Sequence, residues 1–366
     1  MNIGIPKEHL DGEARVATTP EVAKKLVANG LTVMLERGAG EGSHYPDAAY
    51  EEAGVQLTDA AGALGCDLVA KVRKPTAAEV GQMRDGAVFI GHAETCDEDP
   101  VISQMHARNI TVLAMERIPR ISRAQSMDAL SSQSNIAGYR AVIEAANHFG
   151  RFIPLMMTSA GSAKPARVVI LGAGVAGLQA IATARRLGGD VYAYDVRPET
   201  REQILSLGAK PIDLDIGEGA AGEGGYAKEL SEEGKARQQA LLADELAKAH
   251  IIITTALIPC RPAPVLVTED VVRRMREGSV IVDLAAANGG NCPLTEAGKV
   301  VSRHGVVLVG HTNYPSMMPS DASAFYAKNI ANLLDIMLDR SAEVPVLKDL
   351  DEDEITKAAQ LRPSAA

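Results

Sequence analysis

The chain has 366 residues, a length that exceeds one ordinary core and predicts two domains of α/β size. Its 37 basic and 47 acidic residues give a formal net charge of -10, which argues against a nucleic-acid partner or an anionic membrane surface. No apolar run approaches the roughly 20 residues that span a bilayer, and the start, MNIGIPKEH, lacks the apolar core of a secretory signal. We therefore expect a soluble chain that reaches a membrane only through a partner.

The first third of the chain alternates strand-like and helix-like segments. A helix is predicted from Pro20 to Asn29, because Thr19 is a good N-cap, Pro20 suits the first helical position and Gly30 ends the pattern. The alternation predicts a parallel sheet with helices on both faces and right-handed crossovers. The expected strands are 2–5, 31–36, 67–72, 87–90 and 111–115, and the other expected helices are 47–53, 76–83 and 99–108.

Residues 119–135, PRISRAQSMDALSSQSN, are rich in hydrogen-bonding side chains and lack a hydrophobic period. A polar linker between domains would have this composition. A ligand-binding loop would have it too, since the stretch follows the last strand of the first domain, where open α/β sheets bind ligands. In the second case Arg120, Gln125, Asp128 and Ser131 are the candidates to bind a carboxamide and a ribose.

A glycine-rich turn follows a predicted connecting helix over 134–149 and an extended stretch over 151–166. The strand that begins at Arg167 leads into Gly172-x-Gly174-x-x-Gly177 and then into a helix-forming segment. In this motif the first glycine permits a tight turn, the second lets backbone approach a pyrophosphate, and the third lets the helix pack against the strand. The helix N-terminus then offers free N–H groups to the phosphates, so we expect a dinucleotide-binding turn.

An acidic residue closes the next strand, Val191 to Tyr194, because Asp195 follows it 18 residues after Gly177. A carboxylate here accepts hydrogen bonds from an adenosine ribose and repels a 2′-phosphate, which favours NAD over NADP. Arg197 tempers this preference, since an arginine nearby can meet a 2′-phosphate. Further strands at 210–212, 251–254, 279–283 and 306–309 would complete the six of a dinucleotide fold.

The remaining segments define the domain limits. A glycine-rich, charged insertion over 217–239 carries Tyr226 as its one aromatic residue and is either a surface excursion or a lid over the cofactor. A helix over 321–338 is expected to return the chain to the first domain, and the residues after it to form a poorly packed tail or tether.

The predicted fold class is therefore α/β, with two Rossmann-like, doubly wound parallel-sheet domains separated by a cleft and joined by long helices. The first, discontinuous domain is expected to comprise residues 1–133 and 321–366, and the nucleotide-binding domain residues 134–320.

No metal is expected, because the four cysteines show neither a C-x-x-C pattern nor a spacing to histidine that is typical of metal sites. Arg15, Lys71, Arg73 and His92 lie at or near strand ends of the first domain. The residues alone leave their roles open between surface charges and ligand contacts.

Eight segments together resemble one family. They are GIPKE, RVATTPE, RISRAQSMDALSSQSNIAGYRAV, LGAGVAGLQAIATARRLG, GGYAKE, TTALIPCRPAPVL, VIVDLAAANGGNCP and GHTNYPS. This pattern is similar to the soluble NAD(H)-binding component, the first domain of the α-subunit, of proton-translocating nicotinamide nucleotide transhydrogenases. The resemblance extends to about Asp339, and the absence of transmembrane helices resembles the split-subunit bacterial form.

The resemblance implies roles for individual residues. Arg120, Asp128 and Ser131 would hold the nicotinamide carboxamide, and Gln125 would reach the nicotinamide ribose and orient the two nicotinamides. Tyr226 would belong to a mobile loop that folds over the nucleotide. The other implied NAD(H) contacts are Gly172, Gly174, Val175, Ala176, Gly177, Asp195, Val196, Arg197, Ala256 and Leu257.

The implied reaction is direct hydride transfer from NADH on this chain to NADP⁺ on a partner subunit, coupled to proton translocation by membrane subunits in the Si/Re-specific class. Such a transfer needs close approach of two C4 atoms and exclusion of water, but no acid or base. The family also implies a homodimer, located in the cytoplasm and bound to the inner face of the cytoplasmic membrane through its partners.

Alanine dehydrogenase, which shares the fold and the glycine turn, is the alternative. In its pattern Arg15, Lys71 and His92 match residues that bind an amino or keto acid. The position of Ala287, however, carries an aspartate in alanine dehydrogenases, and alanine cannot replace it. A third hypothesis, a module that binds NAD without catalysis, would predict nucleotide binding without hydride exchange.

Overall fold

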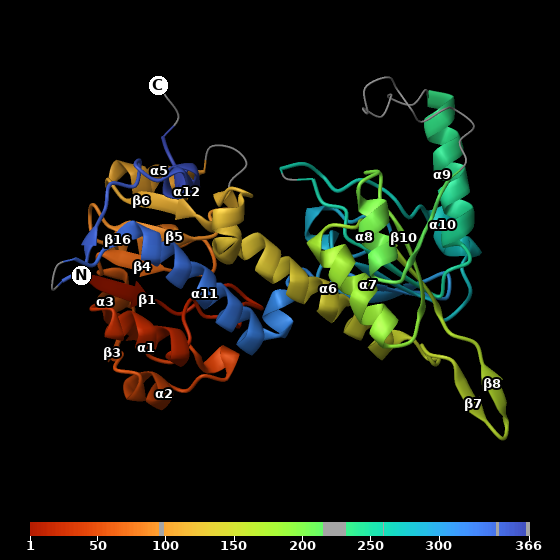
Figure 1. Cartoon of the computed structure of the whole chain (residues 1–366), viewed down its shortest axis with the longest axis horizontal. Helices are drawn as coiled ribbons and strands as arrows, with labels where there is room; N and C mark the ends of the chain where they lie inside the picture. Colours follow the sequence, from red (N-terminus) through yellow and green to blue (C-terminus); the bar gives the residue numbers. More distant parts are fainter. Residues whose placement is uncertain (95–98, 215–231, 259, 342–343, 364–366) are drawn as a thin grey trace. The chain divides into compact units, whose positions relative to one another are not determined.

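A computed structural model describes residues 1–94, 99–214, 232–258, 260–341 and 344–363 of the chain. The chain divides into two compact units, the first formed by residues 1–134 and 315–366 and the second by residues 135–314. Each unit contains a seven-stranded, mainly parallel sheet (Figure 1). The expected α/β fold class with two parallel-dominated sheets is confirmed.

The sheet of the first unit has the order β18-β6-β5-β4-β1-β2-β3, in which β18 runs antiparallel to its neighbour and the other pairs are parallel. All five expected strands are present, while β3 and β18 were not expected. The strands are β1 Asn2–Ile5, β2 Thr32–Glu36, β3 Gln56–Thr58, β4 Leu68–Ala70, β5 Val88–Gly91, β6 Thr111–Ala114 and β18 Gln360–Leu361.

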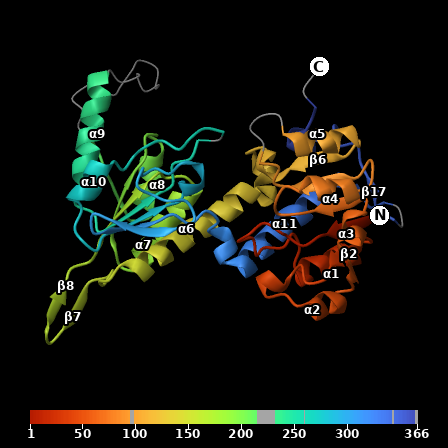
Figure 2. The ribbon, with the colours of Figure 1, turned by 180° about the vertical axis from the view of Figure 1, so that it is seen from behind.

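Helices cover both faces of this sheet, because successive strand residues enter opposite cores. Val88 and Ile90 pack with α1, α11 and α12, whereas Phe89 between them packs with α3, α4 and α5. Accordingly α11 lies in front of the sheet in Figure 1, and α4 in the view from behind (Figure 2). The helices are α1 Pro20–Ala28, α2 Asp47–Glu52, α3 Ala60–Leu64, α4 Ala77–Gln82, α5 Pro100–Ala107, α11 Pro319–Met337 and α12 Glu354–Ala359.

The expectation of a poorly packed tail after Asp339 is wrong. A short hairpin, β16 Leu338–Asp339 with β17 Val346–Leu347, leads to α12, which lies next to β6, and β18 then pairs with β6 (Figure 1). Ile355 and Ala359, four residues apart, are completely buried in the core. A spacing of four between apolar residues indicates one face of a helix, but in the sequence this pattern is surrounded by acidic residues and is therefore difficult to recognise.

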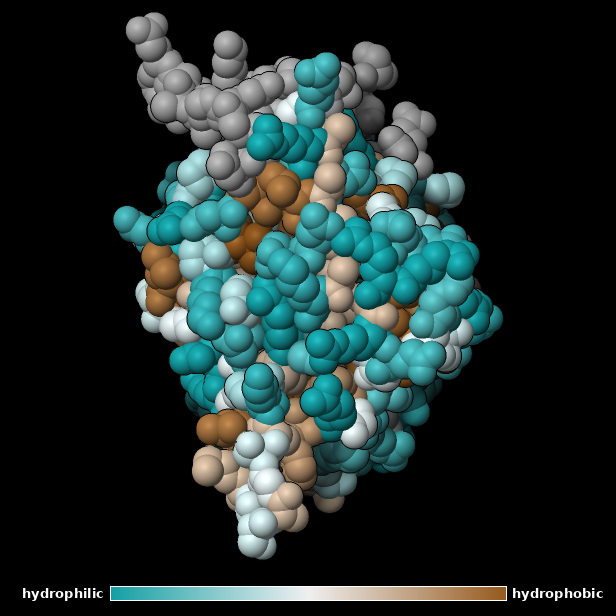
Figure 3. Space-filling view, turned by 90° about the vertical axis from the view of Figure 1, so that its right-hand side faces the viewer, coloured by the Kyte–Doolittle hydropathy of each residue, from teal (hydrophilic) through white to brown (hydrophobic). Residues whose placement is uncertain are grey.

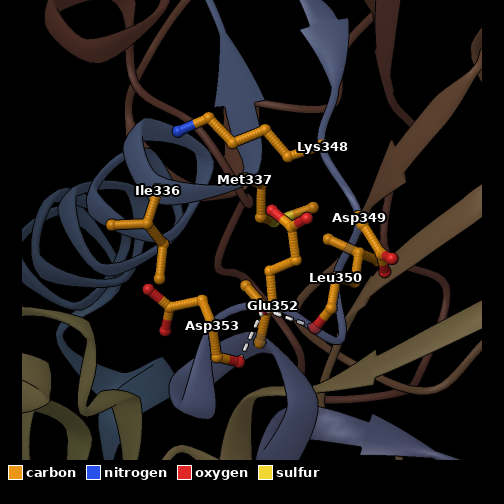
Figure 4. Close-up of a pocket in the computed structure, with 8 residues that line it drawn as sticks. Ile336, Met337, Lys348, Asp349, Leu350, Glu352 and Asp353 are labelled. Atoms are coloured by element: carbon orange, nitrogen blue, oxygen red, sulfur yellow. Dashed lines mark hydrogen bonds between the residues drawn. The ribbon is translucent and has the colours of Figure 1, made fainter.

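A cavity of about 250 Å³ lies between the end of α11, the loop that follows β17 and the start of α12 (Figure 4). Thr356 closes one side of it, because its hydroxyl donates to the carbonyl oxygens of Leu350, at 2.7 Å, and Asp353, at 3.1 Å. The C-terminal segment is therefore an integral part of the first unit.

The sheet of the second unit has the order β11-β10-β9-β12-β13-β15-β14. Its six parallel strands follow the 3-2-1-4-5-6 order of dinucleotide-binding folds. All four strands expected after Asp195 are present, and an unexpected antiparallel strand, β14, is added at the edge. The strands are β9 Arg167–Leu171, β10 Asp190–Tyr194, β11 Lys210–Pro211, β12 Ile251–Thr254, β13 Val280–Asp283, β14 Val300–Arg303 and β15 Val306–Val309.

The helices of this unit are α7 Val175–Arg186, α8 Thr200–Ser206, α9 Glu232–Leu246 and α10 Glu269–Arg274.

Two expectations for the residues that precede β9 need correction. The connecting helix α6, Ala129–His148, begins five residues before the expected start, since Asp128 caps it. The expected extended stretch 151–166 instead folds back as a hairpin, β7 Met156–Thr158 with β8 Gly161–Ala163.

Candidate functional site

The glycine turn after β9 is shaped by two close contacts of its own backbone. Gly172 has a φ of +98°, and a Cβ there would lie 2.4 Å from Oγ1 of Thr255. A Cβ on Gly177 would lie 1.8 Å from the carbonyl oxygen of Gly172. These two glycines are thus required by the fold, for the turn and for the packing of α7 on β9.

Gly174 differs from the other two glycines of the motif. It is exposed, its φ of -78° is open to any residue, and a Cβ there would meet no atom within 4 Å. It is also the N-cap of α7, and it has no side chain with which to cap that helix. The motif therefore leaves the N-terminus of α7 open beside a residue without a side chain, which is the arrangement that binds a pyrophosphate.

Asp195 lies at the carboxyl end of β10 and faces this turn. Its Oδ2 accepts a hydrogen bond from the backbone N–H of Ala173 at 2.7 Å, and Oδ1 accepts one from the N–H of Arg197 at 2.9 Å. The Arg197 guanidinium adds two bonds of 3.0 Å, one to each carboxylate oxygen. Burial opposes ionisation of Asp195, but Arg197 and these N–H groups outweigh it and lower the pKa of the carboxyl group.

The end of β12 joins the same edge of the sheet. The hydroxyl of Thr255 donates to the carbonyl oxygens of Leu171 and Gly172, at 3.1 and 3.2 Å, so Ala256 and Leu257 follow directly from a residue bonded to the turn. Leu257 and Val196, which follow the ends of β12 and β10, expose 51% and 76% of their surface. Val175 is exposed and Ala176 half-buried at the start of α7. The structure thus brings the expected nucleotide contacts together.

Sequence reasoning missed Asn291, which holds the loop after β12. This side chain is fully buried, and its Nδ2 donates to the carbonyl oxygens of Ala256, at 2.9 Å, and Pro264, at 2.8 Å. Asp283 fixes the neighbouring strand end by accepting four hydrogen bonds, from Thr254, Ala285, Cys292 and Thr295. An asparagine after two glycines indicates a loop in the sequence, but its partners lie more than 25 residues away.

The polar stretch that was expected to be a loop is largely helical and belongs to the first unit. Residues Ser122–Met127 form a 3-10 helix, η3, and α6 begins at Ala129. Asp128 accepts hydrogen bonds from the backbone N–H of Ser131 at 2.9 Å and from its hydroxyl at 2.6 Å. Asp128 and Ser131 are therefore one hydrogen-bonded pair, while Arg120 and Gln125 are exposed to solvent on the same stretch.

The C-terminal segment holds this stretch through residues that the sequence did not single out. Asn329 of α11 bonds to Ser126 and Ser132, which flank the Asp128–Ser131 pair. Arg123 donates to both carboxylate oxygens of Asp353, at 2.7 and 2.9 Å, just before α12. Only the tertiary fold brings these partners together, since they lie about 200 residues apart in the chain.

Arg15, Lys71 and His92 lie in the interior of the first unit, each next to a carboxylate. Nζ of Lys71 is 2.5 Å from Oε1 of Glu79, and Nδ1 of His92 is 3.4 Å from Oε2 of Glu116. Arg15 and Lys71 are 4% and 2% exposed. The two cations are thus already paired with protein carboxylates, which weakens their net attraction for a ligand carboxylate.

The remaining expected residues are Ala287 and Tyr226. Ala287 lies in a 3-10 helix, η4 Ala286–Asn288, directly after the end of β13. Tyr226 lies outside the described residues. Within the described ranges, no group of three or more histidine, cysteine or acidic side chains could hold a metal ion, and no helix is both long and apolar enough to cross a bilayer.

The strand order, the open glycine turn and the acid after β10 define a dinucleotide-binding α/β protein. Comparison with known families agrees. The model described as alanine dehydrogenase/PNT, N-terminal domain, matches residues 4–137, and the model of the alanine dehydrogenase/PNT C-terminal domain matches residues 141–360. The chain belongs to the alanine dehydrogenase/PNT family.

Within this family the chain is more similar to transhydrogenase relatives than to an alanine dehydrogenase. It is 52% identical to the first part of the NAD(P) transhydrogenase alpha subunit of Rhodospirillum rubrum over 361 residues, 96% of this chain and 94% of that protein. A crystal structure of transhydrogenase from Sinorhizobium meliloti is 47% identical, with a TM-score of 0.88, and the match covers 99% of this chain and 98% of that one. Alanine dehydrogenase of Bacillus subtilis is 29% identical over 350 residues, 91% of this chain and 86% of that protein.

Proposed function

We propose that this chain is the NAD(H)-binding component of a proton-translocating NAD(P) transhydrogenase of the Si/Re-specific class. Hydride would pass directly from NADH on this chain to NADP⁺ on a partner subunit, and membrane subunits would couple the transfer to proton translocation. The observation that carries the proposal is the 52% identity to a transhydrogenase subunit over 96% of this chain, and the open space at Gly174 next to Asp195 supports an NAD(H) site.

The residues at the glycine turn fit a bound NAD(H). The free N–H groups at the start of α7 would hold the pyrophosphate, and Asp195 would accept hydrogen bonds from the adenosine ribose. To admit the ribose, the exposed Arg197 guanidinium would move off the carboxylate, while the backbone N–H groups of Ala173 and Arg197 keep Asp195 ionised. The negative charge of Asp195 would disfavour the 2′-phosphate of NADPH.

The stretch from Arg120 to Ser131 would bind the nicotinamide end. Arg120, Asp128 and Ser131 would hold the carboxamide, and Gln125 would reach the ribose and fix the direction in which the ring is presented. Tyr226, outside the described residues, would close over the nucleotide. The bound cofactor supplies the carbon that gives or takes the hydride. These side chains would therefore position the nicotinamide and exclude water, and none of them has to move a proton.

Two observations argue against the alternative, an amino-acid dehydrogenase. Such an enzyme binds its substrate carboxylate with a cation, whereas Arg15 and Lys71 are buried and already paired with Glu13 and Glu79. It also needs an acidic group where this chain has Ala287, a side chain that can neither donate nor accept a proton.

We also propose that the chain forms a homodimer through the β7–β8 hairpin. The hairpin and the residues that lead into it expose Phe152, Leu155 and Met157 at 58%, 56% and 75% of their surface, and the lower end of the face in Figure 3 is correspondingly rich in apolar colour. A lone two-stranded hairpin is marginally stable in water, so a second copy would both cover and stabilise it. Attachment of this chain to membrane subunits would place it at the inner face of the cytoplasmic membrane.

The dimer proposal has a direct test in the sedimentation of one variant. Met157→Asp should shift the protein from dimer to monomer in analytical ultracentrifugation, because the dimer would bury the new charge. Leu10→Asp adds the same charge to an exposed leucine of the first unit and serves as the control. A Met157→Asp protein that stays dimeric would contradict the assignment of the interface.

The reaction itself is tested by pairing the chain with an NADP(H)-binding transhydrogenase component. We expect tight binding of NADH, weak binding of NADPH, and hydride transfer from NADH to an NADP⁺ analogue only when the partner is present. Gln125→Asn should slow this transfer and leave NADH affinity largely intact, because it changes orientation more than binding. Production of NADH from alanine by the chain alone would instead establish the dehydrogenase, and nucleotide binding without exchange in any pairing would indicate a binding module.

A further inference from the structure

We propose that Asn329, on α11, is a positioning residue that holds the Gln125–Ser131 segment in the geometry needed for hydride transfer. The inference rests on the proposed function of that segment. Asn329 is 6% exposed, and its amide uses both ends. Nδ2 donates to the carbonyl oxygen of Ser126 at 2.8 Å, and Oδ1 accepts from the hydroxyl of Ser132 at 2.7 Å.

The two bonds bracket the functional residues in the chain. Ser126 directly follows Gln125, and Ser132 directly follows Ser131. One side chain thus links the end of η3 to the first turn of α6, with Asp128 between them. Because the carbonyl of Ser126 can only accept, the donor end of the amide must face it, which fixes the orientation of Asn329.

Ala124, Met127 and Ala129 anchor this stretch in the apolar core of the first unit, but the polar bonds at this point are weak. The turn that leads into Asp128 is closed by a bond of 3.4 Å from its N–H to the carbonyl of Gln125, which is long for such a bond. The 3-10 geometry of η3 is also weaker than that of an α-helix. The other nearby anchor, the Arg123–Asp353 pair, is half-exposed on the arginine side, so water competes for it. The buried amide of Asn329 is therefore the polar contact that ties both flanks of the Gln125–Ser131 segment to α11, beside the apolar packing of Met127 and Ala129.

A neighbouring asparagine provides a matched control. Asn332, one turn further along α11, donates to the same Ser126 carbonyl at 3.0 Å, but it is only half-buried and makes no bond to Ser132 among the described residues. A carbonyl oxygen has two lone pairs, so it keeps a partner when Asn332 is removed. Of the two asparagines, Asn329 is the one that bonds to both flanks of the segment.

The experiment compares Asn329→Leu, Asn329→Asp and Asn332→Leu, each combined with an NADP(H)-binding component. In Asn329→Leu we expect the rate of hydride transfer to fall by about tenfold or more, since small misplacements of positioning groups are costly, and the NADH dissociation constant to change by less than about threefold. Asn332→Leu should change both by less than about twofold. Amide hydrogen exchange at Asp128 and Ser131 should accelerate in Asn329→Leu alone.

Asn329→Asp keeps the acceptor for Ser132 and loses the donor for Ser126, so it covers the case in which the leucine variant does not fold. Hydride transfer by Asn329→Asp should be slower than by the wild-type protein, while the thermal unfolding of the variant remains cooperative. If folded Asn329 variants transfer hydride at the rate of an active wild-type protein, the positioning role is overturned. If the wild-type protein transfers no hydride with any partner, the proposed function fails instead, and that result is visible before any variant is measured.

Discussion

The guanidinium group of Arg15 holds the carboxylate of Glu13 at both oxygens, with Nε 2.8 Å from Oε1 and Nη2 2.6 Å from Oε2. Nη1 of Arg15 donates to Gln133 at 2.8 Å, and Arg73 reaches Glu13 from the other side at 2.9 Å. Arg15 would bind a substrate carboxylate in the dehydrogenase pattern, but here it forms a structural ion pair with Glu13. The carboxyl groups of Glu13 and Glu8 lie in this interior. Their contributions to the free energy of unfolding should respond to pH in opposite directions.

Glu13→Gln should lower the free energy of unfolding at pH 7 by about 3 kcal/mol. Burial alone would raise the pKa of Glu13, but the hydrogen bonds and charges of Arg15 and Arg73 lower it to about 2, against 4.5 as the ordinary value. A lowered pKa means that the stabilisation is complete above about pH 4.5 and is lost as the pH falls toward 2. Urea unfolding of both proteins at pH 7 and pH 3.5 measures this change.

A surface pair supplies the control for this experiment. Glu21 bonds to Lys25 across one turn of α1, and both side chains are about two-thirds exposed. Glu21→Gln should therefore change the stability at pH 7 far less than Glu13→Gln does, because solvent screens an exposed pair. Equal effects of the two substitutions would show that the Arg15–Glu13 pair is no better than a solvated one.

Glu8 should contribute in the opposite sense. Burial raises its pKa to about 7, although the charge of Lys71, 3.7 Å away, and the N–H groups of Val72 and Arg73 oppose this. A raised pKa means that its contribution is complete below about pH 4.5 and is lost as the pH rises through 7. Glu8→Gln should thus become more stable relative to wild type between pH 5 and pH 8. A constant difference over that range, measured by urea unfolding, would contradict the raised pKa.

The glycines of the nucleotide turn should separate folding from binding. Gly172→Ala should destabilise the protein by about 2 kcal/mol or more, because it needs φ near +98° and a Cβ 2.4 Å from Thr255. Gly174→Ala should cost about 1 kcal/mol or less, since nothing lies near its Cβ and only the N-cap preference for glycine over alanine is lost. It should nevertheless weaken NADH binding by about tenfold, as the methyl group occupies the space of the pyrophosphate. Thermal unfolding and a fluorescence titration with NADH distinguish these effects.

The sequence allows the nucleotide turn to be predicted because its determinants are local. The strand, the three glycines, the helix and Asp195 follow one another within 29 residues, and each has one physical role. The same holds for α1, whose cap, proline and terminal glycine are adjacent to it. In these cases a short segment carries both the signal and its structural meaning.

The anchors of the candidate site could not be predicted in this way. Asn329 and Arg123 bond to partners about 200 residues away, and nothing in their own neighbourhood marks them. The start of α6 was placed too late for a different reason, since serine and glutamine residues at 131–134 favour loops and caps as well as a first helical turn. Composition misled most for the C-terminal segment, where acidic residues surround a small apolar face.

The packing of the C-terminal segment gives the last prediction. Ile355→Ala should reduce the free energy of unfolding by about 2–5 kcal/mol, because the side chain is fully buried between α12 and the sheet and its loss leaves a cavity. Lys357→Ala alters an exposed residue of the same six-residue helix and should have almost no effect. A loosely attached tail would make the two variants alike. Because β18 pairs with β6 directly after α12, exchange of the β6 amides should also accelerate in Ile355→Ala and stay slow in Lys357→Ala.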